Sequence, residues 1–172
     1  MRYASIRKMD ISNGEGVGVA LFVQGCSFHC KGCFNSETWD FNGGKEWTEE
    51  VENDFLELVS KPYITRISIL GGEPLEKENL GCLYYLVMKI KKDYPDKKIW
   101  IYSGYTFEKL MSDYPQINVF RQLILKYCDV LVDGQFEEDK KDLMLKFRGS
   151  KNQRVIDVQE SLKQNKVILY CE

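Results

Sequence analysis

The sequence predicts an α/β fold: a partial, open β/α barrel with about six mostly parallel strands. Short apolar runs alternate with amphipathic stretches along the chain, which is typical of parallel strands joined by crossover helices. Six strands in 172 residues are too few for a complete eight-stranded barrel, which typically needs about 250 residues. A doubly wound sheet is the alternative. No repeat, low-complexity segment or linker is present, so we expect residues 1–172 to form a single domain.

In the first half of the chain, two predicted strands are each followed by a helix. Residues 18–23 and 64–70 are apolar runs rich in branched side chains, which predicts buried strands. Thr48 is a favourable N-cap, and the two glutamates after it suit a first helical turn. A second helix is predicted to end before Pro95. The apolar faces of the two helices consist of Val51, Phe55, Leu58 and Val59, and of Leu80, Leu83, Val87 and Ile90.

The second half continues with shorter elements. Residues 99–102 and 130–132 predict the third and fourth strands, and helical stretches begin at Thr106 and Asn118. The last two strands are predicted at 154–158 and 167–170. In parallel α/β folds the carboxyl ends of the strands meet at one rim, where sites form. The strand ends expected at this rim are Gln24-Gly25, Gly71-Gly72-Glu73, Ser103-Gly104 and Asp133-Gly134.

Charge and hydropathy exclude several classes of protein. The net charge is −2 and no basic block occurs, so nucleic-acid binding driven by phosphate contacts is not expected. The longest apolar run, residues 17–23, is too short to span a membrane, and it lacks the layout of a cleavable signal. We therefore expect a cytoplasmic protein with reduced thiols and no membrane partner.

Three cysteines follow the first predicted strand with the spacing CxxxCxxC: Cys26, Cys30 and Cys33. Iron–sulfur clusters are ordinarily held by four cysteines, so three thiolates favour a cubane in which one iron is open to another ligand. Structural zinc is the alternative, because His29 lies inside the motif, but zinc sites usually pair two short units and no second one occurs. A disulfide framework does not suit three cysteines so close together in a chain without a secretion signal.

A second motif, Gly71-Gly72-Glu73-Pro74, ends the second predicted strand. Two glycines allow close approach of the backbone to a ligand and positive φ angles, and the carboxylate of Glu73 can accept hydrogen bonds from an ammonium group. Alone, the run would be interpreted as a strand-to-helix turn with a solvated glutamate, but its place one βα unit after the three cysteines favours a ligand site. We expect a side chain at Gly72 to block ligand binding while the iron–sulfur cluster still assembles.

Together, the two motifs resemble those of the radical S-adenosylmethionine superfamily. The resemblance implies that Cys26, Cys30 and Cys33 hold a [4Fe–4S] cluster whose fourth iron is chelated by S-adenosylmethionine. It implies reductive cleavage of this cofactor to a 5′-deoxyadenosyl radical that abstracts a hydrogen atom, with no catalytic residue beyond the cluster and the cofactor. The methionine ammonium would be held by Gly71, Gly72 and Glu73.

The resemblance also suggests further cofactor contacts. Many members of the superfamily carry an aromatic residue just before the third cysteine, beside the adenine, but here that position is Gly32 and the aromatic Phe34 follows. We therefore assign the adenine contact to the backbone of Gly32, Cys33 and Phe34. Ser103 and Asp133 at strand ends are candidates for contacts to the ribose or the ammonium, or else are turn residues.

Further sequence blocks narrow the resemblance. Residues 26–35, 102–108, 132–136 and 147–157 recur in this order and are similar to the family of activating proteins of anaerobic ribonucleoside-triphosphate reductase, over nearly the whole chain. The resemblance implies that the substrate is a glycine Cα–H of the partner reductase, which becomes a glycyl radical. It also implies an electron donor such as flavodoxin or ferredoxin.

Two features fit a protein substrate independently. No second cysteine group is available for an auxiliary iron–sulfur cluster, and a partial barrel leaves one side open. The alternatives are an activase of another glycyl radical enzyme, such as a formate lyase, a radical enzyme acting on a small metabolite, and a non-catalytic metal-binding or electron-carrying module. Cys82 and Cys128 are expected to be structural thiols, and no role is assigned to Cys171.

Overall fold

A computed structural model of the chain describes residues 1–112 and 118–171. Its strands are β1 (Arg2–Asp10), β2 (Gly18–Val23), β3 (Lys45–Glu46), β4 (Arg66–Gly71), β5 (Lys98–Ser103), β6 (Val130–Asp133), β7 (Arg154–Asp157) and β8 (Leu169–Cys171). Its α-helices are α1 (Glu49–Ser60), α2 (Lys77–Asp93), α3 (Phe107–Met111), α4 (Asn118–Leu125) and α5 (Val158–Gln164). Two short 3-10 helices are η1 (Ser36–Thr38) and η2 (Glu138–Lys140). None of the helices in these two ranges is long and apolar enough to cross a membrane.

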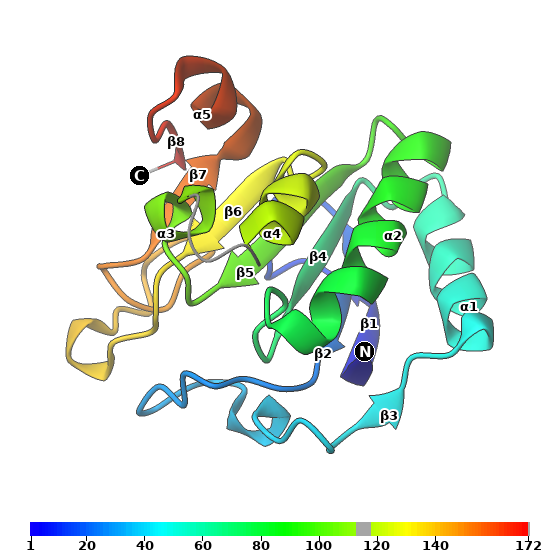
Figure 1. Cartoon of the computed structure of the whole chain (residues 1–172), viewed down its shortest axis with the longest axis horizontal. Coiled ribbons are helices and arrows are strands. Elements are labelled where there is room, and N and C mark those ends of the chain that lie inside the picture. The colour runs from blue at the N-terminus through cyan, green and yellow to red at the C-terminus, as the bar shows by residue number, and fades with distance from the viewer. Residues whose placement is uncertain (113–117, 172) are drawn as a thin grey trace.

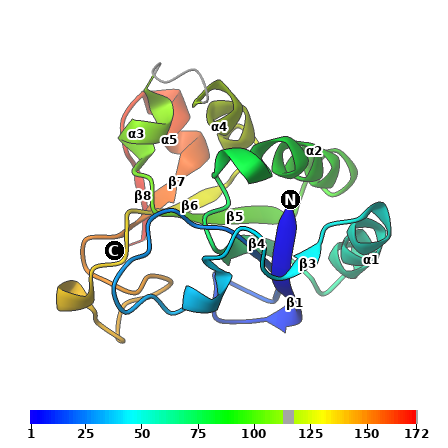
Figure 2. The same cartoon turned by 60° about the horizontal axis from the view of Figure 1, so that its bottom comes forward.

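One open sheet joins the strands in the order β3-β1-β2-β4-β5-β6-β7-β8 (Figure 1). The α-helices lie on one face of this sheet, and the long loops after β2 and β6, with their 3-10 helices, lie toward the other (Figure 2). Strands β2, β4, β5 and β6 are parallel neighbours, as the sequence predicts. Val23 pairs with Gly71 and Ser103 pairs with Asp133, so the expected alignment of strand ends at one rim is confirmed.

The outer strands correct the prediction of about six mostly parallel strands. The sheet has eight strands, and β1, β3, β7 and β8 pair antiparallel with their neighbours. Three of its seven pairings are therefore parallel and four are antiparallel. The β-strand predicted at 154–158 also ends one residue early, because Asp157 caps α5 and accepts a hydrogen bond from the Glu160 amide at 2.9 Å.

Alternating side chains divide the parallel strands between two environments. Leu21, Ile69, Ile101 and Leu131 belong to the main core, where the helices cover the sheet. Helix α1 begins as predicted, with the hydroxyl of Thr48 accepting a hydrogen bond from the Val51 amide at 3.3 Å. The neighbouring strand residues Phe22, Leu70, Tyr102 and Val132 point to the opposite face, away from the described α-helices.

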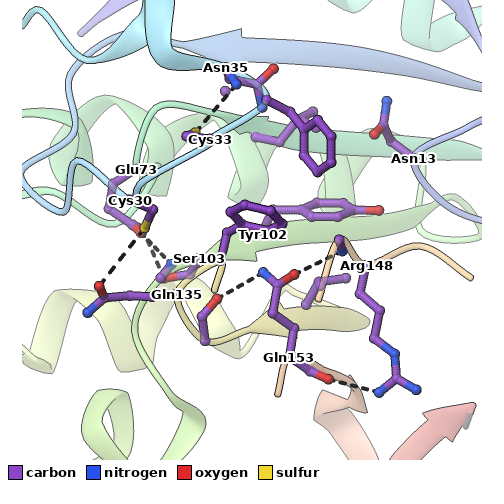
Figure 3. Close-up of a pocket in the computed structure, with 18 of the residues that line it drawn as sticks. Asn13, Cys30, Cys33, Asn35, Glu73, Tyr102, Ser103, Gln135, Arg148 and Gln153 are labelled. Atoms are coloured by element: carbon purple, nitrogen blue, oxygen red, sulfur yellow. Dashed lines mark hydrogen bonds between the residues drawn. The ribbon is translucent and has the colours of Figure 1, made fainter. Parts of the chain in front are cut away.

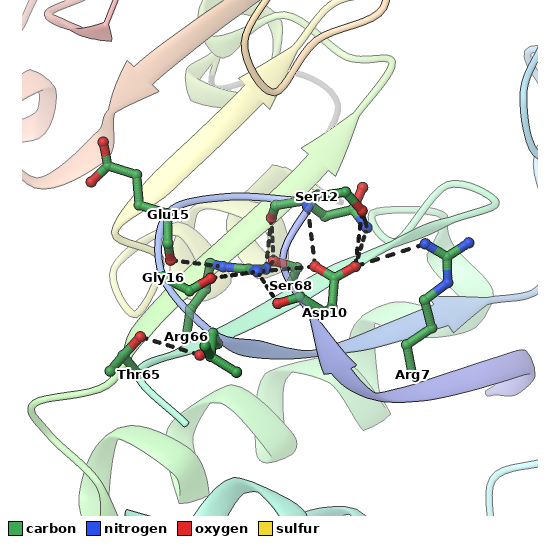
Figure 4. A network of polar contacts seen from close by, with 10 residues as sticks. Arg7, Asp10, Ser12, Glu15, Gly16, Thr65, Arg66 and Ser68 are labelled. Atoms are coloured by element: carbon green, nitrogen blue, oxygen red, sulfur yellow. Dashed lines mark hydrogen bonds and ion pairs between the residues drawn. The ribbon is translucent and has the colours of Figure 1, made fainter. Parts of the chain in front are cut away.

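A buried ion pair lies at the amino ends of the parallel strands, on the face opposite the α-helices (Figure 4). The side chain of Arg66 is 1% exposed and lies 2.9 Å from the carboxylate of Asp10. Its guanidinium also donates to the main-chain oxygens of Asn13 at 2.8 Å and Glu15 at 3.1 Å. Because these carbonyls belong to the segment 11–17, Arg66 holds that segment across the sheet.

Candidate metal and cofactor site

A cavity of about 580 Å³ lies at the carboxyl ends of the parallel strands, on the face opposite the α-helices (Figure 3). Cys26, Cys30, Cys33, Glu73 and Ser103 line one end of it, which we call the thiol end. Among the other residues expected to bind the cofactor, Phe34, Gly71 and Gly72 also line the cavity. The cysteine motif and the Gly-Gly-Glu motif, which are far apart in the sequence, thus line the same cavity, as the sequence predicts.

The loop that carries the cysteines is held in place by aromatic contacts. Three rings of the loop pack against three other parts of the chain, in the β5–α3 turn, just after η1 and in the loop after β6. The ring centroids are 4.8 Å apart for Phe28 and Tyr105, 4.6 Å for His29 and Trp39, and 5.2 Å for Phe34 and Phe136. His29 therefore stacks on an indole, which gives its side chain a packing role in place of the zinc ligand weighed above.

The thiols themselves have few protein partners. The Cys30 thiol lies 3.9 Å from the side-chain oxygen of Gln135, and the Cys33 sulfur accepts from the Asn35 amide at 3.4 Å. Burial raises the pKa of Cys26 to about 11 and also raises that of Cys30. Both thiols are thus protonated until a metal displaces the protons.

The donor set fits a cubane better than a single metal ion. Within residues 1–112 and 118–171, no three His, Cys, Asp or Glu side chains are arranged to hold one ion. Tetrahedral zinc needs four ligands that converge on one point. In a cubane each thiolate binds a different iron, so three thiols that line one cavity without converging on a single point suit it.

Glu73 is the buried carboxyl group of the thiol end. Its side chain accepts hydrogen bonds from the Ser103 hydroxyl at 2.9 Å, the Leu75 amide at 2.9 Å and the Gly104 amide at 2.7 Å. Burial outweighs these bonds and raises the pKa of Glu73 to about 7, with the residue 1% exposed. The carboxyl group is therefore fixed in orientation, and it titrates near neutral pH.

The raised pKa of Glu73 predicts a pH-dependent stability. The folded protein binds this proton up to about pH 7, whereas the unfolded chain releases it near pH 4.5. The free energy of unfolding should therefore fall as the pH rises between these values, by about 3 kcal/mol. Urea unfolding of the wild type and of Glu73→Gln from pH 5 to pH 8 tests this. The variant should lose that part of the slope, and parallel curves for the two proteins would contradict the assignment.

Gly71 and Gly72 are required by close contacts between backbone segments. Gly71 has a φ of +103°, and a Cβ atom there would lie 2.8 Å from the Val23 carbonyl oxygen. A Cβ atom on Gly72 would lie 2.5 Å from the carbonyl oxygen of Gly25, which already accepts from the Glu73 amide at 2.8 Å. Gly25 directly precedes the first cysteine, so the glycine pair supports the cysteine loop as well as the cavity.

This contact changes the expected effect of a substitution at Gly72. Even Gly72→Ala should push the backbone of Gly25 and displace the cysteine loop, so iron loading and cofactor affinity should fall together. Gly81→Ala is the matched control, because a Cβ atom there meets nothing within 4 Å. Iron content after anaerobic reconstitution distinguishes displacement of the cysteine loop from obstruction of the cofactor pocket alone. A Gly72→Ala protein with full iron content would mean that the side chain blocks only the cofactor.

Two of the residues expected to bind the cofactor do not line the cavity. The carboxylate of Asp133 accepts from the Arg154 side chain at 3.0 Å and from the Phe107 amide at 2.7 Å, so it joins β6, β7 and α3 behind the cavity wall. Gly32 has a φ of +72° and faces the side chain of Glu138 in η2. Both residues directly precede residues that line the cavity, namely Cys33 and Gly134.

The cavity is also lined by Asn13, Tyr102 and Gln135, which the sequence does not single out, and by Arg148, a polar residue of block 147–157 whose expected role is a cofactor or partner contact or a loop cap. Asn13 and Tyr102 lie at the end opposite the thiols, which we call the tyrosine end, and Gln135 and Arg148 line the wall formed by the loop after β6 (Figure 3). The sequence offers only weak signals for them, such as the position of Gln135 directly after a strand-end glycine. Their proximity follows from long-range contacts between loops.

Comparison with known proteins agrees with this site. The profile of a family described as "4Fe-4S single cluster domain" matches residues 12–156, which contain all three cysteines of the thiol end. The chain thus contains a 4Fe–4S single cluster domain, within the α/β fold described above.

Individual relatives identify the family within this class of 4Fe–4S proteins. The chain is 40% identical over 155 residues to the anaerobic ribonucleoside-triphosphate reductase-activating protein of Pasteurella multocida, covering 89% of this chain and 95% of that protein. The proteins of the same name from Vibrio cholerae and Escherichia coli K12 are 38% and 37% identical over 155 and 157 residues, covering 89% and 90% of this chain and 96% and 97% of their own lengths. The chain belongs to the family of anaerobic ribonucleoside-triphosphate reductase-activating proteins.

Proposed function

We propose that this chain is a radical S-adenosylmethionine activase. It cleaves S-adenosylmethionine reductively and abstracts a hydrogen atom from a glycine of an anaerobic ribonucleoside-triphosphate reductase, which leaves a glycyl radical in the reductase. The observation that carries the proposal is the thiol end, where three thiols, a buried carboxyl group and two tightly packed glycines line one cavity in a member of this family. We propose that residues 1–172 act as a single domain whose curved sheet forms a partial β/α barrel.

Each residue of the thiol end has a defined task in this proposal. Cys26, Cys30 and Cys33 would bind three irons of the [4Fe–4S] cluster, and the fourth iron would take S-adenosylmethionine. When bound, the cluster and the cofactor supply the electron transfer that breaks a C–S bond and produces a radical able to abstract hydrogen. Glu73 would accept a hydrogen bond from the methionine ammonium. Ser103 would contact the ribose or the ammonium.

The remaining residues of the site orient the cofactor and exclude water. The backbone of residues 32–34 would contact the adenine, and the ring of Phe34 would shield it. Gly71 and Gly72 allow the β4 turn to approach both the cysteine loop and the ligand. Asp133 would act through Arg154 and the Phe107 amide, by fixing the β6 end of the rim.

The partners follow from the same chemistry. The reductase supplies the glycine, and a one-electron donor such as flavodoxin or ferredoxin reduces the cluster. Thiols that must stay reduced until iron binds suit the cytoplasm. Nothing in the charge of the chain, −2 in total, suggests a nucleic-acid partner.

The decisive experiment is anaerobic reconstitution. The protein should hold about four irons per chain, the content of one cubane, and should release 5′-deoxyadenosine when a reductant and S-adenosylmethionine are added. With the anaerobic reductase of the same organism, electron paramagnetic resonance should show a doublet glycyl-radical signal that persists after the activase is removed.

Other outcomes would separate the alternatives. Activation of a formate lyase but not of the reductase would keep the activase and change the partner. Consumption of a free metabolite with both glycyl radical enzymes silent would favour a small-molecule radical enzyme. If the reconstituted protein bound stoichiometric zinc and no iron, it would be a non-catalytic metal-binding module.

A further inference from the structure

Tyr102 carries a buried hydroxyl group at the tyrosine end of the cavity. The side chain extends from β5 away from Cys30 and Cys33, toward the side where Asn13 lies (Figure 3). Its ring packs beside two groups of buried apolar residues, which include Phe22 and Trp100. Among the described residues, none forms a hydrogen bond with its hydroxyl oxygen, which is buried.

Two charged side chains act on this hydroxyl, and both are already engaged. Arg66 and Asp10 influence the pKa of Tyr102, but they pair with each other at 2.9 Å and with the segment 11–17. The main-chain oxygen of Asn13 accepts from Arg66 and from the Ser68 hydroxyl. Burial raises the pKa of Tyr102 further above its usual value, so the hydroxyl stays protonated and can donate.

An unpaired buried hydroxyl is unfavourable in the isolated protein, because the group loses its bonds to water and gains none in return. A phenylalanine would fill the same space without this penalty. The tyrosine is therefore explained by an acceptor that none of the described residues supplies and that enters the cavity from outside.

We propose that the Tyr102 hydroxyl donates a hydrogen bond to a main-chain carbonyl of the glycine-bearing segment of the partner reductase. This inference rests on the proposed function. A glycine has no side chain, so a segment that presents its Cα inside the cavity offers main-chain carbonyls as the nearest acceptors. A single donor opposite the thiol end would fix the depth and the orientation of that segment.

The test compares Tyr102→Phe with Tyr63→Phe, whose tyrosine is 54% exposed in the turn after α1. Thermal unfolding and affinity for the reductase are measured on the iron-loaded proteins under anaerobic conditions. Tyr102→Phe should unfold at the same or a higher temperature, yet bind the reductase roughly 3- to 10-fold more weakly, which is the effect of one neutral hydrogen bond. Tyr63→Phe should change neither value.

Three results would overturn the inference. Unchanged affinity of Tyr102→Phe for the reductase would show that the hydroxyl has no partner there. A lower unfolding temperature would reveal an internal partner, such as a bound water. Weaker binding of S-adenosylmethionine with unchanged reductase affinity would assign the hydroxyl to the cofactor. A wild-type protein that neither binds nor activates the reductase would instead refute the proposed function itself.

Discussion

Replacing any one of Cys26, Cys30 or Cys33 with alanine is expected to abolish the cleavage of S-adenosylmethionine. All three line the thiol end, and with no other cysteine there, two thiolates would leave a second iron without a protein ligand. Each variant should contain much less iron and sulfide than the wild type after anaerobic reconstitution. The release of 5′-deoxyadenosine should fall below detection.

Cys82→Ala is the matched control for this series. Cys82 lies on α2, partly buried against the main core, so its loss should affect packing alone. This variant should keep the full iron content and form 5′-deoxyadenosine at the wild-type rate. If one of the three thiol-end variants retained both properties, that cysteine would not be a ligand of the iron–sulfur cluster.

Arg66→Met should destabilise the protein by about 3–5 kcal/mol, because it leaves the carboxylate of Asp10 buried without its cation. Both side chains are 1% exposed. Burial alone would raise the pKa of Asp10, but hydrogen bonds from Arg66 and Asn13 outweigh it and hold the pKa below its usual value. The substitution also frees the carbonyls of the segment 11–17 that Arg66 now binds.

Urea unfolding of the iron-loaded protein measures this effect, with Arg7→Met as the control. Arg7 faces the same carboxylate at 3.7 Å, but its side chain is 55% exposed. Its loss should change the free energy of unfolding by only about 0.5 kcal/mol. Equal effects of the two substitutions would mean that burial does not govern the strength of this ion pair.

The parallel centre of the sheet could be predicted because its strands are continuous apolar runs. Strands β2, β4, β5 and β6 are almost wholly buried, so composition alone marks them. Strand β1 has only Tyr3 and Asp10 fully buried, and its extended state depends on pairing with β2. Strand β3 has two residues, too few for any periodic pattern. The start of helix α5 could be predicted from the sequence, because Asp157 and Glu160 have the spacing of a capping box.

Some residues of the site could be predicted from local motifs, whereas the roles of others depend on long-range contacts. The cysteine spacing and the Gly-Gly-Glu run are local, and their residues line one cavity. Asp133 looks like a site residue from its strand-end position, but the partner that engages it, Arg154, lies 21 residues later. Tyr102 could not be singled out, because an unpaired hydroxyl is a property of its surroundings and not of its sequence.

The three aromatic contacts of the cysteine loop bear on how the protein withstands oxygen. Phe28, His29 and Phe34 pack against rings outside the loop, and none of these three contacts involves iron. Oxidative destruction of the inorganic core should then leave a ready chelator whose backbone need not refold. Repair becomes a matter of supplying iron, sulfide and electrons, and the same polypeptide can serve through repeated cycles of damage and reloading.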